Sequence, residues 1–160
     1  MPALILVLAI AENGVIGNSG AIPWRIGDDL KRFRRLTLEK PVVMGRKTWD
    51  SLPKKPLERR TNIVVTRQPD WQGVGALAAS SLDDAIAKAA QAPDVMVIGG
   101  AQIYRAALPN AQRIELTEVH RQFEGDARFA FDRQAWREVA REEHATEDGL
   151  RFSYVTLTRK

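Results

Sequence analysis

Apolar residues recur along the chain in short runs rich in Val, Ile and Leu, a pattern that predicts buried β-strands. These runs cover residues 3–11, 41–44, 62–66, 95–98, 113–119 and 151–158. The first run imitates the core of a signal peptide, but it lacks a basic lead-in and is followed by a turn at Glu12-Asn13-Gly14. It is also too short to span a bilayer as a helix, so we expect a central strand.

Between several of these runs the apolar positions change to helical spacing. One stripe consists of Leu30, Phe33 and Leu36. A second lies between a capping-box pair, Ser81 and Asp84, and a stop at Pro93; a third ends at Pro109. The apolar members of these two stripes are Leu82, Ala85, Ile86, Ala89 and Ala90, then Ile103, Tyr104, Ala107 and Leu108.

Strands that alternate with helices indicate a parallel sheet with helices on both faces. After Pro109 the pattern shows strands without helices, and Asp148-Gly149 is typical of a hairpin turn. We therefore expect an α/β fold: a central mixed, mostly parallel sheet flanked by helices, with a C-terminal antiparallel hairpin. The length of 160 residues fits a single domain over residues 1–160.

Composition narrows the function classes. Hydrophobic residues make up 44% and charged residues 28%, which is ordinary for a globular protein. The absence of cysteine excludes disulfides, thiolate catalysis and sulfur-ligated zinc. His120 and His144 have no partners at ligand spacing, so we expect no metal. The net charge of +4 is dispersed, which disfavours nucleic-acid binding; we expect no membrane association and a cytoplasmic location.

Two segments could form part of a binding site. The stretch 12–23 carries Gly14, Gly17 and Gly20 before Pro23-Trp24, and it is either a functional loop or a tolerated surface excursion. Asp29 lies in a first helical turn beside the apolar stripe. Its carboxylate either favours the helix dipole or, if Asp28 fills that role, faces inward and holds a cationic or amidine-like ligand.

Three further segments are suited to an anionic ligand. Gly45-Arg46-Lys47-Thr48 follows a strand and opens a short helix, so it is either a phosphate cradle or a solvated turn. Thr66-Arg67 ends another strand, where ligands bind in open α/β sheets. Gly99-Gly100 joins a buried strand to a helix and indicates either close approach by a ligand or tight packing. Neither the Walker nor the dinucleotide fingerprint is present.

Taken together, these segments resemble dihydrofolate reductase of the bacterial chromosomal type, and their order and approximate spacing hold over essentially the whole chain. Any one of the motifs is weak, whereas the ordered set is highly specific. The matching stretches are Gly14-Val15-Ile16-Gly17, Ile22-Pro23-Trp24, Asp29-Leu30 with Phe33, Val43-Met44-Gly45-Arg46-Lys47-Thr48-Trp49, Arg60-Thr61-Asn62, Val65-Thr66-Arg67, Val97-Ile98-Gly99-Gly100-Ala101-Gln102-Ile103-Tyr104, Leu116-Thr117 and Glu124-Gly125-Asp126.

The resemblance implies reduction of 7,8-dihydrofolate to tetrahydrofolate, with hydride transfer from NADPH to C6 and protonation at N5. It assigns the catalytic centre to Asp29, Trp24, Thr117 and Ile22. Asp29 would bind the pterin N3 and 2-amino group, and Arg60 the glutamate tail of the substrate. The implied substrate contacts, which antifolates such as methotrexate or trimethoprim would share, are Val7, Ala9, Asp29, Leu30, Phe33, Leu52, Leu57, Arg60, Ile98, Tyr104 and Thr117.

For the cofactor, the resemblance implies that Arg67 with Thr66 recognises the 2′-phosphate and that the Gly99-Gly100 peptide is cis. The loop around Asn18 and Ser19 would close over the nicotinamide, steadied by Asp126. The full set of implied NADPH contacts is Ala9, Ile16, Gly17, Asn18, Ile22, Gly45, Arg46, Lys47, Thr48, Thr66, Arg67, Ile98, Gly99, Gly100, Ala101, Gln102 and Ile103. A monomer is the family expectation.

Some positions depart from the family pattern. Arg32 occupies a helix position that is often aromatic, and Gln102 stands where some relatives carry an arginine on the diphosphate. The stretch 53–58 is charged and one residue longer than in enterobacterial relatives, which leaves open whether Leu57 or a neighbour lines the tail pocket.

Two other functions compete. A pyrimidine reductase of the riboflavin pathway would share the NADPH half but not Pro23-Trp24 followed by Asp29, Phe33 and Arg60. A basic nucleic-acid-binding module would need a clustered cationic face with stacking aromatics, whereas Trp24 and Phe33 fit an apolar cleft better.

Overall fold

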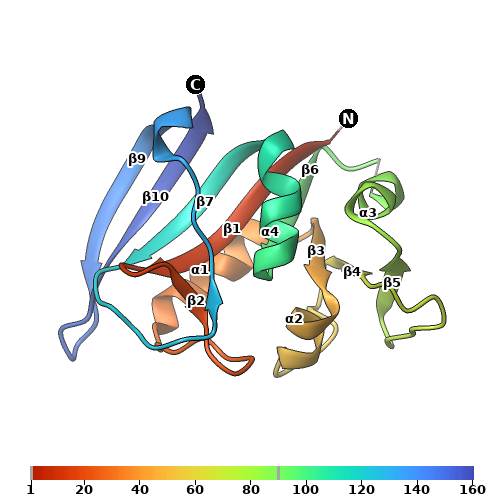
Figure 1. The fold of residues 1–160 in the computed structure, drawn as a ribbon, viewed down its shortest axis with the longest axis horizontal. Helices are drawn as coiled ribbons and strands as arrows, with labels where there is room; N and C mark the ends of the chain where they lie inside the picture. The colour runs from red at the N-terminus through yellow and green to blue at the C-terminus, as the bar shows by residue number, and fades with distance from the viewer. Residues whose placement is uncertain (1, 90) are drawn as a thin grey trace.

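The computed structural model describes residues 2–89 and 91–160. Its elements follow the expected order of strands and helices (Figure 1). In chain order they are β1 (Ala3–Ala11), β2 (Val15–Gly17), α1 (Gly27–Thr37), β3 (Pro41–Gly45), α2 (Arg46–Ser51), β4 (Thr61–Val65), β5 (Ala76–Ala79), α3 (Leu82–Lys88), β6 (Asp94–Gly99), α4 (Ala101–Ala107), η1 (Leu108–Asn110), β7 (Ala111–Val119), β8 (Ala127–Arg128), η2 (Arg133–Ala135), β9 (Trp136–Ala145) and β10 (Arg151–Arg159).

Eight strands form one sheet in the order β5-β4-β3-β6-β1-β7-β10-β9. All pairs from β5 to β7 are parallel, whereas β10 runs antiparallel to both β7 and β9. The predicted fold class, a mostly parallel sheet with a C-terminal antiparallel hairpin, is therefore confirmed. The first strand lies at the centre, between β6 and β7, which explains why its sequence is almost continuously apolar.

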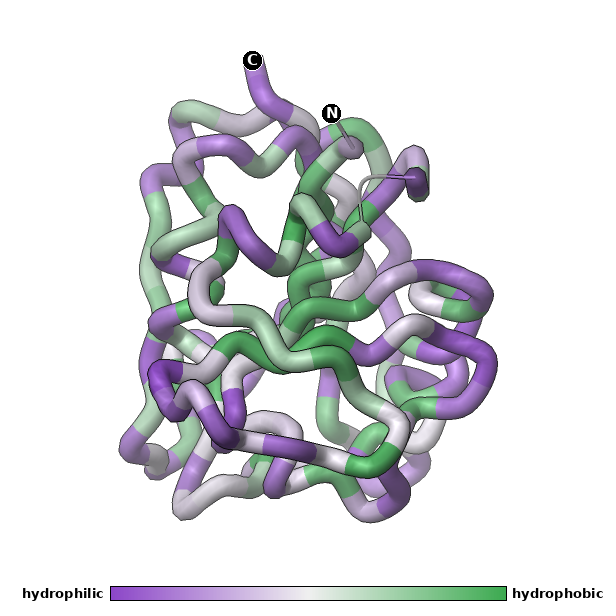
Figure 2. Tube along the Cα trace, turned by 90° about the vertical axis from the view of Figure 1, so that its right-hand side faces the viewer, coloured by the Kyte–Doolittle hydropathy of each residue, from purple (hydrophilic) through white to green (hydrophobic). Residues whose placement is uncertain are grey.

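The helices cover both faces of the sheet, with α1 behind it and α3 and α4 in front in Figure 1. The face under α1 presents Ile5, Val7, Val42, Met44 and Met96, and Phe33 and Leu36 pack against them. The central strands form the apolar interior, while the outer turns are mainly polar (Figure 2). Within the described residues, no helix is long and apolar enough to cross a membrane.

The packed stripe of α1 differs from the predicted one at its first member. Leu30 is 65% exposed, whereas Asp29, Phe33 and Leu36 are half-buried and Thr37 is buried. Asp28 is exposed, and the N-cap of the helix is Ile26, so no side-chain cap is formed there among the described residues. Both acids lie in the first turn, where the helix dipole favours them, but only Asp29 faces the sheet side.

Other elements are shorter or less regular than predicted. The Ser81 hydroxyl accepts from Asp84 N at 3.0 Å, so the predicted cap is confirmed, although Asp84 in turn accepts from Ser80 N. The helix α3 ends at Lys88, before Pro93; Ala90 lies outside the described residues. After α4 the chain makes a further 3-10 turn that contains Pro109. Strands β2, β5 and β8 were not predicted, because two to four residues carry too little periodicity.

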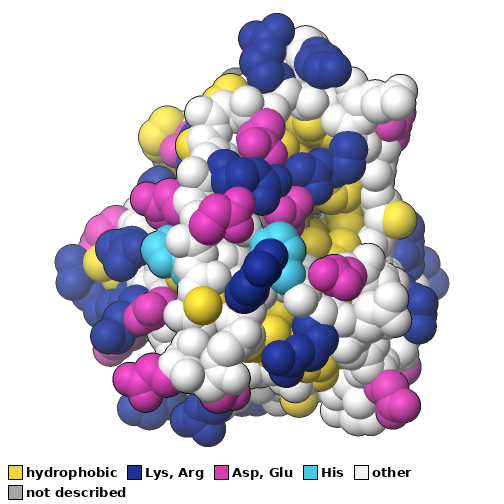
Figure 3. All heavy atoms as spheres, turned by 90° about the vertical axis from the view of Figure 1, so that its left-hand side faces the viewer, with side chains coloured by type: hydrophobic (Ala, Val, Ile, Leu, Met, Phe, Trp, Pro, Cys, Tyr) yellow, Lys and Arg dark blue, Asp and Glu magenta, His cyan; other side chains and the backbone are white. Residues whose placement is uncertain are grey.

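The predicted turn at Asp148-Gly149 joins β9 to β10, with Gly149 at a φ of +92°. Residues 137–145 of β9 are all exposed. This strand lies at the edge of the sheet, where charged side chains disfavour pairing with other chains. Figure 3 shows basic and acidic side chains interleaved on this side of the molecule. Arg133 and Arg141 both bond Glu118, at 2.9 and 2.8 Å. These two arginines are paired with acids, which does not favour contact with nucleic-acid phosphates at this point.

A buried amide holds the charged segment between α2 and β4. Asn62 is 2% exposed, accepts from Leu57 N at 2.9 Å, and donates to the carbonyl oxygens of Leu57 and Arg60 at 2.9 and 3.0 Å. These three bonds fix the position of Leu57, which packs against the α1 face of the core. Asn62 thereby links the sheet to a loop that carries several predicted substrate contacts.

We predict that Asn62→Ala lowers the free energy of unfolding by about 2–4 kcal/mol, because three backbone groups lose their buried partner. Urea denaturation followed by circular dichroism measures this change. Gln112→Ala, at an exposed position of β7, is the matched control and should change stability by less than about 0.5 kcal/mol. Equal stability of N62A and the parent chain would show that the loop is held by other contacts.

Candidate active site

A hydrogen bond between α1 and the centre of the sheet joins two residues that are far apart in the sequence. The Thr117 hydroxyl donates to Asp29 Oδ1 at 2.7 Å. Thr117 is buried on β7, where it pairs with Ala9 of β1 on one side and with Tyr154 of β10 on the other. The fold therefore brings into contact two residues that the resemblance assigns to the catalytic centre.

The surroundings of this carboxylate are mainly apolar. Burial raises the pKa of Asp29 above its ordinary value, while the bond from Thr117 and the positive charge of Arg32 act in the opposite direction. Around it, several apolar side chains are only half-buried although they pack on the core; these are Ala9, Phe33, Leu52, Leu57 and Ile98. Such a wall with one acid is suited to a flat apolar ligand that carries hydrogen-bond donors.

The neighbouring predicted residues divide into buried and exposed ones. Trp24 is 9% exposed and packs against Phe123, with ring centroids 5.1 Å apart. In contrast, Ile22 is 57% exposed, in the turn that leads from β2 to α1, and Leu30 is exposed as described above. Trp24 is thus part of the packed core under the site, whereas Ile22 and Leu30 present free apolar surface.

Arg60 is positioned for a ligand carboxylate. Its Nε donates to the carbonyl of Glu58 at 2.9 Å, and its Nη1 donates to the Thr37 hydroxyl at 3.1 Å. Within the described part of the chain, its third nitrogen, Nη2, makes no hydrogen bond. Burial, followed by the charge of Arg34, lowers the pKa of Arg60 from its usual value. The guanidinium is therefore fixed through Nε and Nη1, and Nη2 is available to bind a ligand carboxylate.

The two glycines at the end of β6 meet the segment that ends β3. The Gly99-Gly100 peptide is cis, and Gly99 has a φ of +118°. A Cβ added at Gly100 would lie 3.7 Å from Thr48 Oγ1, and one at Gly45 would lie 3.4 Å from Ile103 Cγ1. The fold thus brings together two motifs more than fifty residues apart, which the sequence suggested only as separate candidates.

Tyr104 connects this corner to the acid side of the site. Its hydroxyl donates to the carbonyl of Val7 on β1 at 2.7 Å. A Cβ added at Gly99 would lie 3.2 Å from the hydroxyl oxygen of Tyr104. Burial raises the pKa of Tyr104, so its hydroxyl stays protonated. Tyr104 therefore has its hydroxyl occupied within the protein and fixes β1 against the twin-glycine corner.

Three cations lie near this corner, at the carboxyl ends of β3 and β4. Arg46 is 3.4 Å from Asp50, whereas Lys47 and Arg67 are exposed and make no ion pair with any described residue. Thr48 and Thr66 add hydroxyls, the second of which accepts from Gln68 N at 3.1 Å. Cations without ion pairs, next to two glycines that leave room for close approach, fit a flat cofactor with several phosphate groups. Directly after the glycines, α4 begins with Ala101, Gln102 and Ile103.

The segment 12–23 is more regular than predicted, because Val15–Gly17 forms β2 and pairs with β8. Ser19 N donates to Asp126 Oδ1 at 3.1 Å, so the expected neighbour of this loop is in contact with it. A Cβ at Gly125 would lie 2.4 Å from the carbonyl oxygen of Gly17, which leaves room only for glycine there. Ile16 is partly buried against the core, and Asn18 bridges to Ala21 at the tip.

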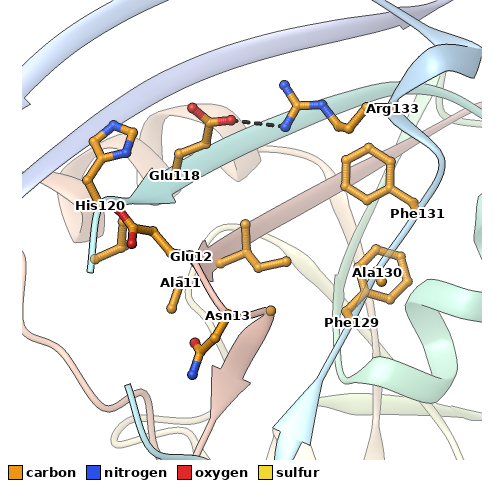
Figure 4. A pocket seen from close by; sticks show the side chains of 12 residues that line it. Ala11, Glu12, Asn13, Glu118, His120, Phe129, Ala130, Phe131 and Arg133 are labelled. Atoms are coloured by element: carbon orange, nitrogen blue, oxygen red, sulfur yellow. Dashed lines mark hydrogen bonds and ion pairs between the residues drawn. The ribbon is translucent and has the colours of Figure 1, made fainter. Parts of the chain in front are cut away.

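A pocket of about 500 Å³ lies on the other face of the sheet (Figure 4). Its walls come from the ends of β1 and β7 and from the strap at residues 129–133, including Phe129 and Phe131. The side chains of Glu118 and His120 line it, whereas Thr117, the residue before Glu118, points the opposite way, toward Asp29. This pocket is therefore separate from the candidate active site.

Three polar residues near the site were not predicted. Glu115 lies two residues before Thr117 on the same face of β7, Tyr154 pairs with Thr117 from β10, and Asn62 holds the loop at Leu57. An acid inside a central strand is an unusual feature that could have identified Glu115. Tyr154 carries no such signal, because tyrosine is common in strands. Asn62 carries none either, because asparagine is common next to a turn.

The chain is similar in sequence to known enzymes over its whole length. The family model for dihydrofolate reductase matches residues 3–159. The chain is 47% identical over 161 residues to the dihydrofolate reductase of Neisseria meningitidis serogroup B, covering 99% of both proteins. It is 43% identical over 159 residues to that of Mycobacterium tuberculosis, covering 96% of both.

A solved structure agrees with this result. The dihydrofolate reductase of Enterococcus faecalis, in complex with NADP(H) and RAB-propyl, has a TM-score of 0.91 to this chain at 33% identity. The similarity covers 99% of this chain and 96% of the other. The resemblance first drawn from the ordered motifs is confirmed, and the chain belongs to the dihydrofolate reductase family, whose reaction depends on NADPH.

Proposed function

We propose that the residues around Asp29 carry the dihydrofolate reductase activity of this chain. The observation that supports this most directly is the Thr117–Asp29 bond at 2.7 Å, because it places one oriented carboxylate on an apolar wall. Asp29 accepts hydrogen bonds from N3 and the 2-amino group of the pterin. Thr117 fixes the carboxylate for that pairing, so the substrate is bound in one orientation.

The apolar wall binds the rest of the substrate. Phe33, Leu52, Leu57 and Ile98 enclose the pterin and benzoyl rings, and Ala9 packs close to the pterin. Arg60 binds the α-carboxylate of the glutamate tail through its free nitrogen. The carbonyl oxygens of Val7 and Ile98 meet the amine edge; that of Val7 already accepts from Tyr104 but retains a second lone pair. Antifolates such as methotrexate or trimethoprim present a similar edge and bind here.

The reaction also requires a proton at N5 of the substrate. Asp29 promotes this protonation through water, since its pairing with N3 places it on the far side of the ring from N5. Burial of Asp29 supports this role, because a desolvated carboxylate is more basic than one in water. Trp24, packed under the site, holds the water in place.

The corner formed by Gly45, Gly99 and Gly100, with the cations beside it, fits a phosphate-rich cofactor. NADPH supplies the hydride when it is bound there. Arg46, Lys47 and Thr48 bind the diphosphate region, and Arg67 with Thr66 binds the 2′-phosphate. The loop carrying Asn18 and Ile22 then covers the nicotinamide and excludes water, with Asp126 holding Ser19.

We predict that Asp29→Asn reduces turnover at neutral pH by about 100- to 10,000-fold, because the amide cannot promote protonation. The loss should be smaller at low pH, where the substrate is already protonated in solution. NADPH oxidation with dihydrofolate, followed by absorbance across pH, measures both effects. Asp28→Asn, one residue away and exposed, is the matched control. Turnover by D29N equal to that of the parent chain would exclude the assigned role.

The same variant has a predicted effect on stability. The folded-state pKa of Asp29 is raised, so the folded protein binds this proton more tightly than the unfolded chain does. Its contribution to stability is then fully present below the unfolded pKa and is lost as pH rises through the folded pKa. D29N should therefore be more stable than the parent chain at neutral pH, and the difference should vanish in acid. Urea denaturation at several pH values tests this; a D29N protein less stable at neutral pH contradicts it.

Arg67→Ala should raise the Michaelis constant for NADPH about 10- to 100-fold and leave that for NADH nearly unchanged, because only NADPH carries the 2′-phosphate. Steady-state kinetics with both nucleotides makes the comparison. Arg137→Ala, an exposed arginine on the edge strand β9, controls for loss of positive charge. Equal effects of R67A on the two nucleotides would exclude this assignment.

A further inference from the structure

Arg32 lies one turn after Asp29 on α1, and it is unusually buried for an arginine. Its side chain is 11% exposed. The guanidinium carbon lies 4.4 Å from the centroid of the Tyr154 ring, and Nη2 lies 3.9 Å from Glu115 Oε1. A cation stacked on an aromatic face and paired with a carboxylate is held in one place.

Glu115 is itself held from several directions. Its side chain is 9% exposed, and Oε1 accepts from the Thr156 hydroxyl at 2.5 Å. Its other oxygen, Oε2, lies 3.9 Å from Arg113 Nε. Glu115 pairs with Thr156 across β7 and β10, two positions along the ladder from the pair of Thr117 and Tyr154 and therefore on the same face of the sheet. One face of the sheet thus carries the anchor of Arg32 and the anchor of Asp29.

We propose that Arg32, clamped between Glu115 and the Tyr154 ring, is a positioning residue that stabilises the charged form of Asp29 and so sets the pH range in which the enzyme works. The proposal rests on the function assigned to Asp29 above. An isolated carboxylate on an apolar wall would take up a proton too readily to remain an anionic partner for the pterin. A fixed cation one helical turn away counteracts this effect without contacting the substrate.

The charges around the carboxylate agree with this assignment. The positive charge of Arg32 lowers the pKa of Asp29 against the larger effect of burial, and the charge of Asp29 in turn helps to raise the pKa of Tyr154. Tyr154 therefore stays neutral, and its hydroxyl makes no hydrogen bond within the described residues. On β1 the facing residues, Val7 and Ala9, do not titrate. The charged groups of α1 that act on Asp29 or Tyr154 are Arg32, Asp28 and Arg35. On β7, Glu115 lies beside Arg32, and Arg113 lies beside Glu115.

The experiment measures the titration of Asp29 directly. Aspartate labelled with ¹³C at the carboxyl carbon is titrated by NMR in the chain without substrate, and the Asp29 signal is identified by its loss in D29N. Arg32→Met should move the titration midpoint of Asp29 upward by about one pH unit. Arg32→Lys should restore most of the parent midpoint, because it keeps the charge. Lys31→Met, an exposed neighbour on α1, should leave it unchanged.

A second variant guards against loss of folding, because R32M leaves Glu115 buried with a weaker partner. The double variant Arg32→Met with Glu115→Gln removes both charges, and it is compared with Glu115→Gln alone, in which only the acid is neutralised. The Asp29 midpoint should be higher in the double variant than in E115Q, because the two differ only in the cation. The pH profile of turnover should move in the same direction as the NMR midpoint. Equal midpoints in folded E115Q and in the folded double variant overturn the proposal. That failure differs from failure of the proposed function, which would instead appear as full activity of D29N.

Discussion

One hydrogen bond determines how this site is built: the one that Thr117 donates to Asp29. A carboxylate is costly to desolvate, so it persists on an apolar wall only when its partners are fixed beforehand. Thr117 is fixed because it lies in the middle of the sheet, between β1 and β10. Asp29 is fixed because α1 packs its Phe33 and Leu36 on the same face. The architecture of the sheet is therefore what allows the half-buried Asp29 to keep its place on an apolar wall.

The cofactor side follows a different principle. There the chain provides glycines and exposed cations at the carboxyl ends of β3, β4 and β6, and among the described residues no acid forms an ion pair with Lys47 or Arg67. Tyr104 joins the two halves, since its hydroxyl bonds β1 while its ring and oxygen lie against Gly99. In the proposed function, the half that contains Asp29 selects a flat heterocycle by hydrogen bonds, and the basic half selects phosphates by charge.

Much of this arrangement was predictable from the sequence. The central strands were predicted because their apolar runs are continuous, and Asp29 and the twin glycines because each breaks a local pattern. The short strands β2, β5 and β8 were not, because they depend on partners rather than on their own residues. Leu30 was placed in the packed stripe by its spacing, but Asp29 takes the inward position instead. Glu115, Tyr154 and Asn62 act through contacts across the fold, which spacing along one segment cannot show.

The central place of β1 has a consequence for synthesis of the chain. This apolar strand is made before both of its neighbours, which begin at Asp94 and Ala111. Until those strands are made, its main-chain groups and its isoleucine and leucine side chains have no sheet to join. Such a segment is prone to pair with other nascent chains, so the order of synthesis leaves it open to aggregation before the sheet can form.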